Sequence, residues 1–246
     1  CVGDKPLQPI DDGCRFLHIP TSGCDHRKRY VRIAVRWGMP GQFKPCVHDG
    51  CLKNQVAAAT NRVMGVVPRP SKDGLRRLRQ TGRALGRRLP STWQMPEDDV
   101  PALYSGRKQL RYERALADVK RAGLARRDAR CTFFVKAEKV NPRAKVNPDP
   151  RAIQFRNPRY SVVLASYLKP IEHHIYALSG DGKTLPRGRL VGKGLSQGGR
   201  ARLLRRKWCE MRKPVAVVLD ASRFDKHVSL ELLRIEHAVY LASNHD

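Results

Sequence analysis

A short apolar run followed by two carboxylates constrains the fold of this chain more than any other stretch. Val215–Leu219 is unbroken and rich in valine, Asp220 follows it directly, and Asp225 lies five residues further on. Such a run is typical of a buried strand, and functional groups of α/β proteins gather at the carboxyl ends of such strands. We therefore expect a strand that holds Asp220 rigidly, as a hard cation such as Mg²⁺ requires. Asp225 would lie in the turn, within reach of a ligand hydroxyl. A strand end followed by a helix-capping aspartate explains the same spacing.

The charge of the chain indicates a polyanionic partner. Its 246 residues include 49 Lys and Arg but 22 Asp and Glu, a formal net charge of +27. Basic surfaces attract phosphate and gain affinity by releasing counterions. The cations occur in short runs interleaved with apolar residues, as in a folded basic surface rather than a disordered arm. Membrane headgroups are the competing polyanion, but the sequence shows no signal peptide and no apolar run near the roughly 18 residues of a membrane span.

The remaining patterns predict a mixed fold of class α/β (α+β). Helices are expected at Asn54–Met64, at Arg107–Leu124, at Tyr160–Ser179 with a bend at Pro170, and from about Ser229, with a further strand at Cys131–Val135. Residues 71–100 are interrupted by glycine and proline and read as a loop or a loose helix. The chain begins with Cys1 and stops soon after Asp220, so we expect a fragment that lacks a sheet partner for the apolar run.

The N-terminal region is rich in cysteine and histidine. Five of the seven cysteines precede residue 52, and an odd total without a secretory signal argues against a disulfide framework. A structural zinc site could draw its ligands from this region, with Cys14, Cys24, Cys46 and Cys51 as the candidates. The paired C-x2-C spacing of zinc knuckles is missing, and buried free thiols with incidental histidines explain the same composition.

Two further segments carry features that suit phosphate. A proline-rich basic loop over residues 131–156 holds its cations at defined positions, where they could act as electrostatic clamps. Ser105 and Gly106 form a small-residue turn ahead of a basic helix, and such a turn allows close approach of a phosphate chain. A solvated basic hairpin and a plain helix-leading turn are the alternatives.

The order of these parts resembles that in the RNA-directed RNA polymerases of positive-strand RNA viruses, and the local amino-acid sequence is closest to the tombusvirus-like group. The resemblance is strong over residues 100–245 and only general over residues 1–60. It rests on four segments, Phe134–Lys139, Arg151–Gln154, Pro158–Tyr160 and Leu219–Ser229, which recur in this order. It implies a right-hand polymerase fold that covers the fingers and the first strand and helix of the palm and ends before the Gly-Asp-Asp turn.

The resemblance also implies roles for individual residues. Asp220 would be the first catalytic metal ligand, for Mg²⁺ or Mn²⁺, and Asp225 would sense the ribose 2′-hydroxyl. Ser105 and Gly106 would guide the template. The expected nucleotide channel is lined by Lys136, Lys139, Lys145, Arg151 and Arg156. Three parts are implied, a Cys/His-rich segment at 1–65, fingers at 66–212 and the start of the palm at 213–246.

The implied function is template-directed nucleotidyl transfer from nucleoside triphosphates during replication of a viral RNA genome. The partners would be template and product RNA, nucleoside triphosphates and other replication proteins, in replication complexes of the host cytoplasm. Without a second carboxylate turn, this chain alone should be inactive but should bind RNA with steep salt dependence. The alternative is a non-catalytic, basic RNA-binding protein of ribosomal or capsid type, although a pure binder gains nothing from carboxylates that face phosphates.

Overall fold

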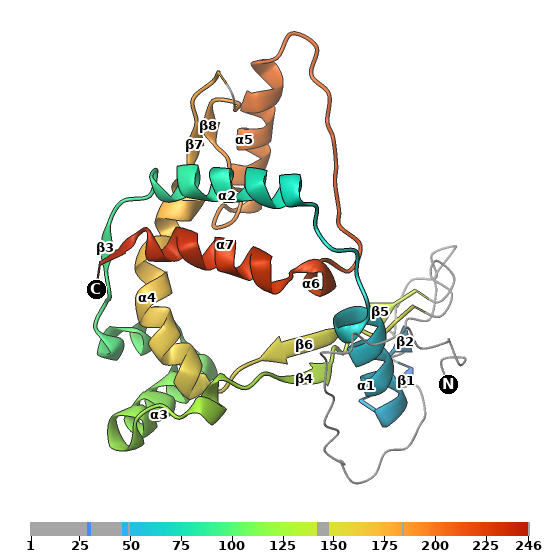
Figure 1. Ribbon diagram of the computed structural model, residues 1–246, viewed down its shortest axis with the longest axis vertical. Coiled ribbons are helices and arrows are strands. Elements are labelled where there is room, and N and C mark those ends of the chain that lie inside the picture. The colour runs from blue at the N-terminus through green and yellow to red at the C-terminus, as the bar shows by residue number, and fades with distance from the viewer. Residues whose placement is uncertain (1–28, 31–45, 49, 142–147, 184, 246) are drawn as a thin grey trace, which may run out of the picture. The chain divides into compact units, whose positions relative to one another are not determined.

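The computed structural model of the chain describes residues 29–30, 46–48, 50–141, 148–183 and 185–245. It mixes helices and strands, which confirms the expected mixed class (Figure 1). Two compact units share the chain, and each is assembled from discontinuous stretches. The first unit comprises Cys1–Arg69, Arg130–Arg156 and Ser222–Ser229, and the second comprises Pro70–Ala129, Asn157–Ala221 and Leu230–Asp246. The division into three consecutive functional parts stays a prediction.

A β-hairpin organises the first unit. Strand β4 (Thr132–Val135) pairs antiparallel with β6 (Ala152–Phe155), and Val135 lies opposite Ala152. The predicted strand is therefore confirmed. The backbone N–H of Lys136 donates a hydrogen bond of 2.7 Å to the carbonyl of Arg151. The register of the hairpin thus places these two cations side by side.

The rest of the first unit is built from short elements. Helix α1 (Leu52–Ala59) continues into a π-helical turn, η1 (Thr60–Met64), which confirms the helix expected at Asn54–Met64. Helix α6 (Phe224–His227) contacts η1. Three two-residue strands form a separate antiparallel sheet in the order β1 (Arg29–Tyr30), β2 (Cys46–Val47) and β5 (Lys139–Val140).

Packed helices dominate the second unit. Helix α3 (Gly106–Ala122) packs on α4 (Pro158–Ala177), which contains Pro170, and both predicted helices are confirmed. Two small cores lie among the helices, one of Val100, Ala115, Leu116 and Val162 and one of Leu89, Ile171 and Val239. The remaining elements are η2 (Glu97–Asp99), η3 (Pro101–Leu103), η4 (Arg126–Ala129), α5 (Gln197–Cys209), the parallel pair β3 (Thr92–Trp93) and β9 (Asn244–His245), and the antiparallel pair β7 (Ser179–Gly180) and β8 (Gly188–Arg189).

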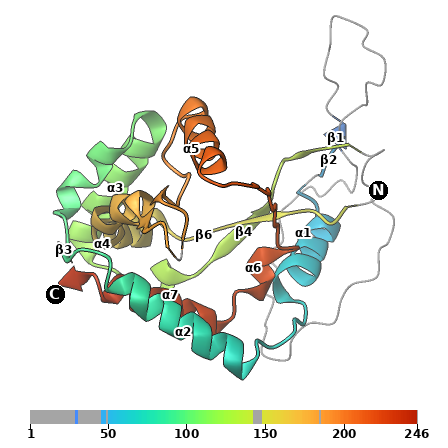
Figure 2. The same ribbon diagram turned by 90° about the horizontal axis from the view of Figure 1, so that it is seen from above.

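Helices α2 (Lys72–Gly86) and α7 (Leu230–Leu241) lie side by side in the second unit (Figures 1 and 2). Helix α7 confirms the helix expected from about Ser229. Helix α2 corrects the prediction of a loop or loose helix, because two of its glycines are buried against α7 and Ser71 caps its first turn by accepting from the N–H of Gly74. Packing and capping here outweigh the low helix propensity of glycine.

The strand predicted at Val215–Leu219 is wrong for this structure. Residues 214–221 form neither helix nor strand, and four of the apolar side chains are between 74% and 91% exposed. A strand is stabilised by backbone hydrogen bonds to a neighbour, and none of the strands in the described part of the chain pairs with this segment. The first palm strand is therefore not formed here, and the right-hand architecture stays a prediction.

Candidate functional site

A polar cavity of about 200 Å³ in the first unit brings together three of the predicted site residues. Lys136 and Arg151 come from the hairpin, and Asp225 comes from α6. We call it the phosphate cavity, and it is lined by Arg62, Val63, Lys136, Arg151, Ala152, Ile153, Gln154 and Asp225. Three cations face one carboxylate, so the lining favours an anion.

Glu138 holds the two hairpin cations. Its carboxylate oxygens lie 3.1 Å from Lys136 Nζ and 3.4 Å from Arg151 Nη1. Burial acts to raise the pKa of Glu138, but the close contact with the Lys136 ammonium and the charge of Arg151 outweigh it, and the pKa is lowered. Glu138 therefore stays ionised and fixes both cations at one end of the hairpin.

Arg62, on η1, is the cation that sequence reasoning missed. Burial and then the like charges of Arg151 and Arg223 lower its pKa, whereas the nearby carboxylates of Asp149 and Asp225 act in the opposite direction. A bound anion would relieve this crowding of positive charge. No sequence signal singled out Arg62, since it is one of 49 basic residues and stands inside an ordinary helical pattern.

A buried carboxylate anchors the turn that leads to Asp225. The side chain of Asp149 is 6% exposed, and one of its oxygens accepts a hydrogen bond of 2.6 Å from Arg223 Nη2. The other oxygen accepts one of 3.1 Å from Asn61 Nδ2. Arg223 adopts a left-handed φ of 54°, which is uncommon for a residue other than glycine. The ion pair thus holds the strained residue directly before α6.

Among the other predicted channel residues, Arg156 is described with its side chain and is not part of the lining of the phosphate cavity. Arg156 follows β6, five residues after Arg151, which corresponds to about 16 Å along an extended strand. Lys139 belongs to β5, and Lys145 lies outside the described residues.

The Ser105–Gly106 turn adjoins a second basic hollow, which belongs to the second unit. Ser105 is the N-cap residue of α3, and Gly106 has a φ of +58°. The glycine is needed for this backbone conformation and not for space, because an added Cβ would meet no atom within 4 Å. The hollow has a volume of about 550 Å³ and is lined by Arg107, Leu110, Arg111, Arg114, Ala115, Asp118, Asn157, Pro158 and Arg159.

Comparison with known proteins decides the family. A family model described as viral RNA dependent RNA polymerase matches residues 22–246. The chain belongs to this family. It is 36% identical over 220 residues to the RNA-directed RNA polymerase of Turnip crinkle virus, which covers 86% of this chain and 28% of the relative. It is 37% identical over 236 residues to that of Tomato bushy stunt virus (strain Cherry), covering 92% and 28%.

These comparisons confirm the resemblance to tombusvirus-like polymerases and do not favour the alternative of a ribosomal or capsid-type binder. The RNA-directed RNA polymerase of Cymbidium ringspot virus is 37% identical over 215 residues, or 83% of this chain and 26% of the relative. The chain therefore spans just over a quarter of the length of the curated relatives it matches. No solved structure matches it.

Of the metal ligands expected in this polymerase family, the described residues offer only Asp220. Asp220 is an exposed carboxylate in the irregular segment 214–221, and the described residues contain no group of three or more His, Cys, Asp or Glu side chains that could hold a metal ion. Asp220 could thus supply one ligand, but the described residues do not fit a complete magnesium site.

The zinc site in the N-terminal region stays a prediction. Cys14 and Cys24 lie outside the described residues, as does the side chain of Cys46, while Cys51 is a buried free thiol. In the described part of the chain, no helix combines the length and the apolar character needed to cross a membrane.

Proposed function

We propose that this chain is part of a viral RNA-directed RNA polymerase and that its phosphate cavity receives the incoming nucleoside triphosphate. The observation that carries the proposal is the meeting of Lys136, Arg151 and Asp225 in one cavity, although the sequence separates the first and last of them by 89 residues (225 − 136). In the complete polymerase, a primer 3′-hydroxyl would attack the α-phosphate of that nucleotide under the direction of an RNA template.

The cations of the phosphate cavity would bind the triphosphate. Arg62 and Arg151 offer planar guanidinium groups that can contact two phosphate oxygens at once, and Lys136 offers a compact point charge. Glu138 already fixes Lys136 and Arg151, so these two side chains need little reorganisation when negative charge develops on the phosphates in the transition state. This preorganisation would support both nucleotide binding and catalysis.

Asp225 would accept a hydrogen bond from the ribose 2′-hydroxyl, the group that separates ribonucleotides from deoxyribonucleotides. A site built around such a bond rejects a substrate that lacks the hydroxyl, because the polar partner is then left unsatisfied. Asp149 would act as a positioning residue, since it ties Arg223 and Asn61 together and thereby fixes the turn before Asp225.

Other assignments follow from membership of the family and await their own tests. The Ser105–Gly106 turn and the basic face of α3 would contact the template, which agrees with the arginines of the adjoining hollow. Asp220 would contribute one ligand to Mg²⁺ or Mn²⁺, whose charge would stabilise the transferring phosphoryl group. Lys139, Lys145 and Arg156 would contact RNA or nucleotide elsewhere along the channel. The setting would be a replication complex in the host cytoplasm that includes other replication proteins.

Steady-state kinetics of a polymerase that contains this chain test the proposal. Arg151→Gln removes one charged hydrogen-bond donor from the phosphate cavity, worth about 1.5–3 kcal/mol, so the KM for every nucleoside triphosphate should rise about tenfold to a hundredfold. Arg130→Gln is the matched control, an exposed arginine just before the same hairpin. Equal KM values in the two variants would overturn the assignment of the cavity. Nucleotide incorporation by the 246-residue chain alone would contradict its expected inactivity.

A further inference from the structure

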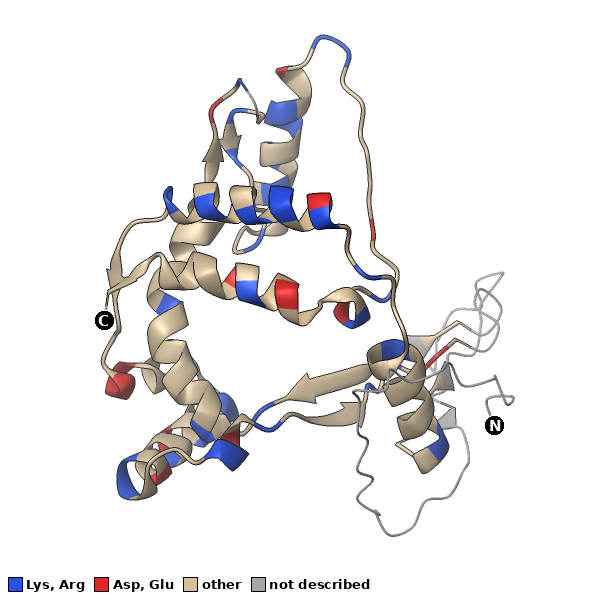
Figure 3. Ribbon diagram, in the orientation of Figure 1, with Lys and Arg blue, Asp and Glu red and all other residues tan. Residues whose placement is uncertain are grey.

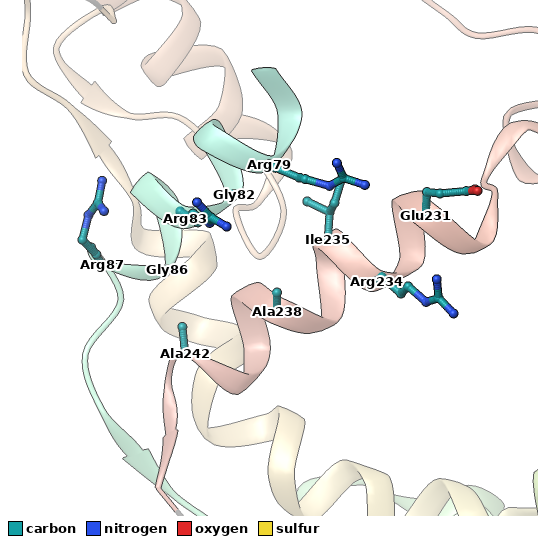
Figure 4. A pocket seen from close by; sticks show the side chains of 10 residues that line it. All are labelled: Arg79, Gly82, Arg83, Gly86, Arg87, Glu231, Arg234, Ile235, Ala238 and Ala242. Carbon is teal, nitrogen blue, oxygen red and sulfur yellow. The ribbon is translucent and has the colours of Figure 1, made fainter. Parts of the chain in front are cut away.

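A groove in the second unit carries a row of arginines that line neither the phosphate cavity nor the hollow beside α3. Helices α2 and α7 enclose a hollow of about 510 Å³ (Figure 4). We call it the arginine groove, and it is lined by Arg79, Gly82, Arg83, Gly86, Arg87, Glu231, Arg234, Ile235, Ala238 and Ala242. Small residues form much of its lining, and arginines of α2 follow one another along it.

Glycine allows the two helices to approach closely at this groove. A Cβ added at Gly82 would lie 3.1 Å from Ile235 Cγ2, and one added at Gly86 would lie 3.0 Å from the Cβ of Ala242. Between the helices the lining is therefore built from glycine, alanine and one isoleucine, which offer no side-chain hydrogen-bond donor. The polar side chains of the groove are all charged: four arginines and Glu231.

The arginines of α2 form a regular line of positive charge. Arg79, Arg83 and Arg87 recur every four residues, so they share one face of the helix and rise by about 6 Å from one to the next. All three are exposed, and within the described part of the chain no carboxylate forms an ion pair with any of them. Figure 3 shows the basic residues repeated along α2.

The neighbouring arginines of the same helix differ in this respect. Arg76 and Arg77 both pair with Asp73, and the Arg77 Nε to Asp73 Oδ2 distance is 2.7 Å. The carboxylate of Asp73 thus offsets one of their two positive charges in the free protein. The three groove arginines of α2 have no such ion pair in the described part of the chain, and the groove also carries one arginine and one glutamate from α7, Arg234 and Glu231.

We propose that the arginine groove binds the phosphate backbone of a single-stranded RNA, independently of its sequence. A line of evenly spaced, uncompensated cations suits a linear polyanion better than a compact one, and the release of counterions would supply the affinity. A membrane surface fits less well, because the apolar residues line a hollow and do not project as an insertable ridge. The inference rests on the proposed RNA-directed function and places an RNA strand on a surface other than the phosphate cavity.

The salt dependence of RNA binding by the 246-residue chain tests this proposal. Each phosphate contact to single-stranded RNA contributes about 0.7 to the slope of log affinity against log salt. The triple variant R79Q/R83Q/R87Q should therefore show a slope lower by about 2 and, at about 50 mM salt, an affinity lower by more than about tenfold. Glutamine and arginine have similar helix propensity, so α2 should persist, as circular dichroism would verify.

A second triple variant is the matched control. R76Q/R77Q/R121Q removes the same number of charges from exposed helix positions of the second unit, but each of these arginines pairs with an aspartate. Its slope should change by less than about 1. Equal slopes in the two triple variants would mean that RNA senses only the net charge, and the proposal would be overturned.

A variant without any change of charge tests the groove itself. Ala238 lines the groove from α7 and is exposed, so Ala238→Trp should fill it and weaken RNA binding several-fold. Unchanged RNA affinity would overturn the proposal, as would vesicles of anionic phospholipid that bind through the three arginines while RNA does not. Because these assays measure binding and not turnover, their failure is distinguishable from a failure of the nucleotide assignment, which the KM of Arg151→Gln reports.

Discussion

The phosphate cavity and the arginine groove both present basic side chains, but within the described part of the chain these are paired with carboxylates in the cavity and unpaired along α2 in the groove. In the cavity, Lys136 and Arg151 are held by Glu138, and Arg62 lies near Asp225 and Asp149. In the groove, Arg79, Arg83 and Arg87 have no carboxylate partner in the described part of the chain. Paired cations keep fixed positions and suit one small anion, whereas unpaired cations on a regular helix suit a long and variable one.

The comparison also shows that net charge alone says little about function. Both regions contribute to the charge of +27, yet one would recognise a nucleotide by geometry and the other would hold RNA by charge density. The difference lies in carboxylates such as Glu138 and Asp149, which lower the net charge but order the cations around them.

The largest expected effect concerns a carboxylate that belongs to neither region. In a polymerase that contains this chain, Asp220→Asn should lower kcat by at least about a thousandfold, because a metal that stabilises phosphoryl transfer is worth several kcal/mol. RNA affinity should stay within about twofold, since phosphate contacts by basic residues dominate it. Single-turnover kinetics and RNA titration at the same Mg²⁺ concentration measure both. A near-normal kcat would remove Asp220 from the metal site.

The next largest effect separates the two regions directly. The double variant K136Q/R151Q should raise the KM for nucleoside triphosphates by more than about a hundredfold, since it removes two charged hydrogen-bond donors, and should leave the salt slope of RNA binding nearly unchanged. R79Q/R83Q/R87Q should do the reverse. If both variants changed both quantities equally, the distinction between cavity and groove would not hold.

A smaller effect tests the anchor of the phosphate cavity. Breaking a fully buried ion pair costs about 3–5 kcal/mol, and because the Arg223 side chain is 26% exposed we expect a coupling energy of about 1–3 kcal/mol between Asp149 and Arg223. Urea unfolding of the chain with Asp149→Asn, Arg223→Gln and the double variant gives this coupling. In the polymerase, Asp149→Asn should also reduce ribose selection, which a purely structural role would leave intact. If the losses of unfolding free energy in the two single variants simply added up in the double variant, the proposed coupling between Asp149 and Arg223 would be contradicted.

The smallest effect is a pH dependence in the second unit. Hydrogen bonds from Lys169 and then Tyr176 lower the pKa of Glu172 from 4.5 to about 2. A lowered carboxylate pKa stabilises the folded state above the unfolded value, and this contribution is lost as the pH falls from about 4.5 toward 2. Thermal unfolding between these pH values should therefore be less pH-dependent in Glu172→Gln than in the wild type. If the melting temperatures of Glu172→Gln and the wild type changed with pH in parallel, Glu172 would not contribute to the pH dependence of stability.

The sequence predicted the local elements of this chain better than its long-range contacts. Helical periodicity identified α3, α4 and α7, and the valine-containing run before Lys136 identified β4. Helix α2 was missed because its glycines are stabilised by contact with α7, a partner more than 140 residues away that local propensity does not report.

The two apolar runs show where sequence patterns stop being sufficient. Val135 belongs to a strand because β6 lies opposite, whereas Val215–Leu219 has the stronger strand pattern but no neighbour among the described strands. In the site, motif resemblance suggested Lys136, Arg151 and Asp225. Arg62 and Asp149 required the structure, since their importance lies in contacts across the first unit.

The ratio of kcat/KM for a ribonucleoside triphosphate to that for its deoxy analogue tests the nucleotide cavity most directly. It should be measured in a polymerase that contains this chain, with Asp225→Asn beside the wild type. Because Asp225 lines the cavity with Lys136 and Arg151, and because the neutral amide accepts a weaker hydrogen bond than the carboxylate, the ratio should fall by about 1 kcal/mol, or several-fold to about tenfold. RNA affinity should not change. An unaltered ratio would contradict the assignment of this cavity to the incoming nucleotide.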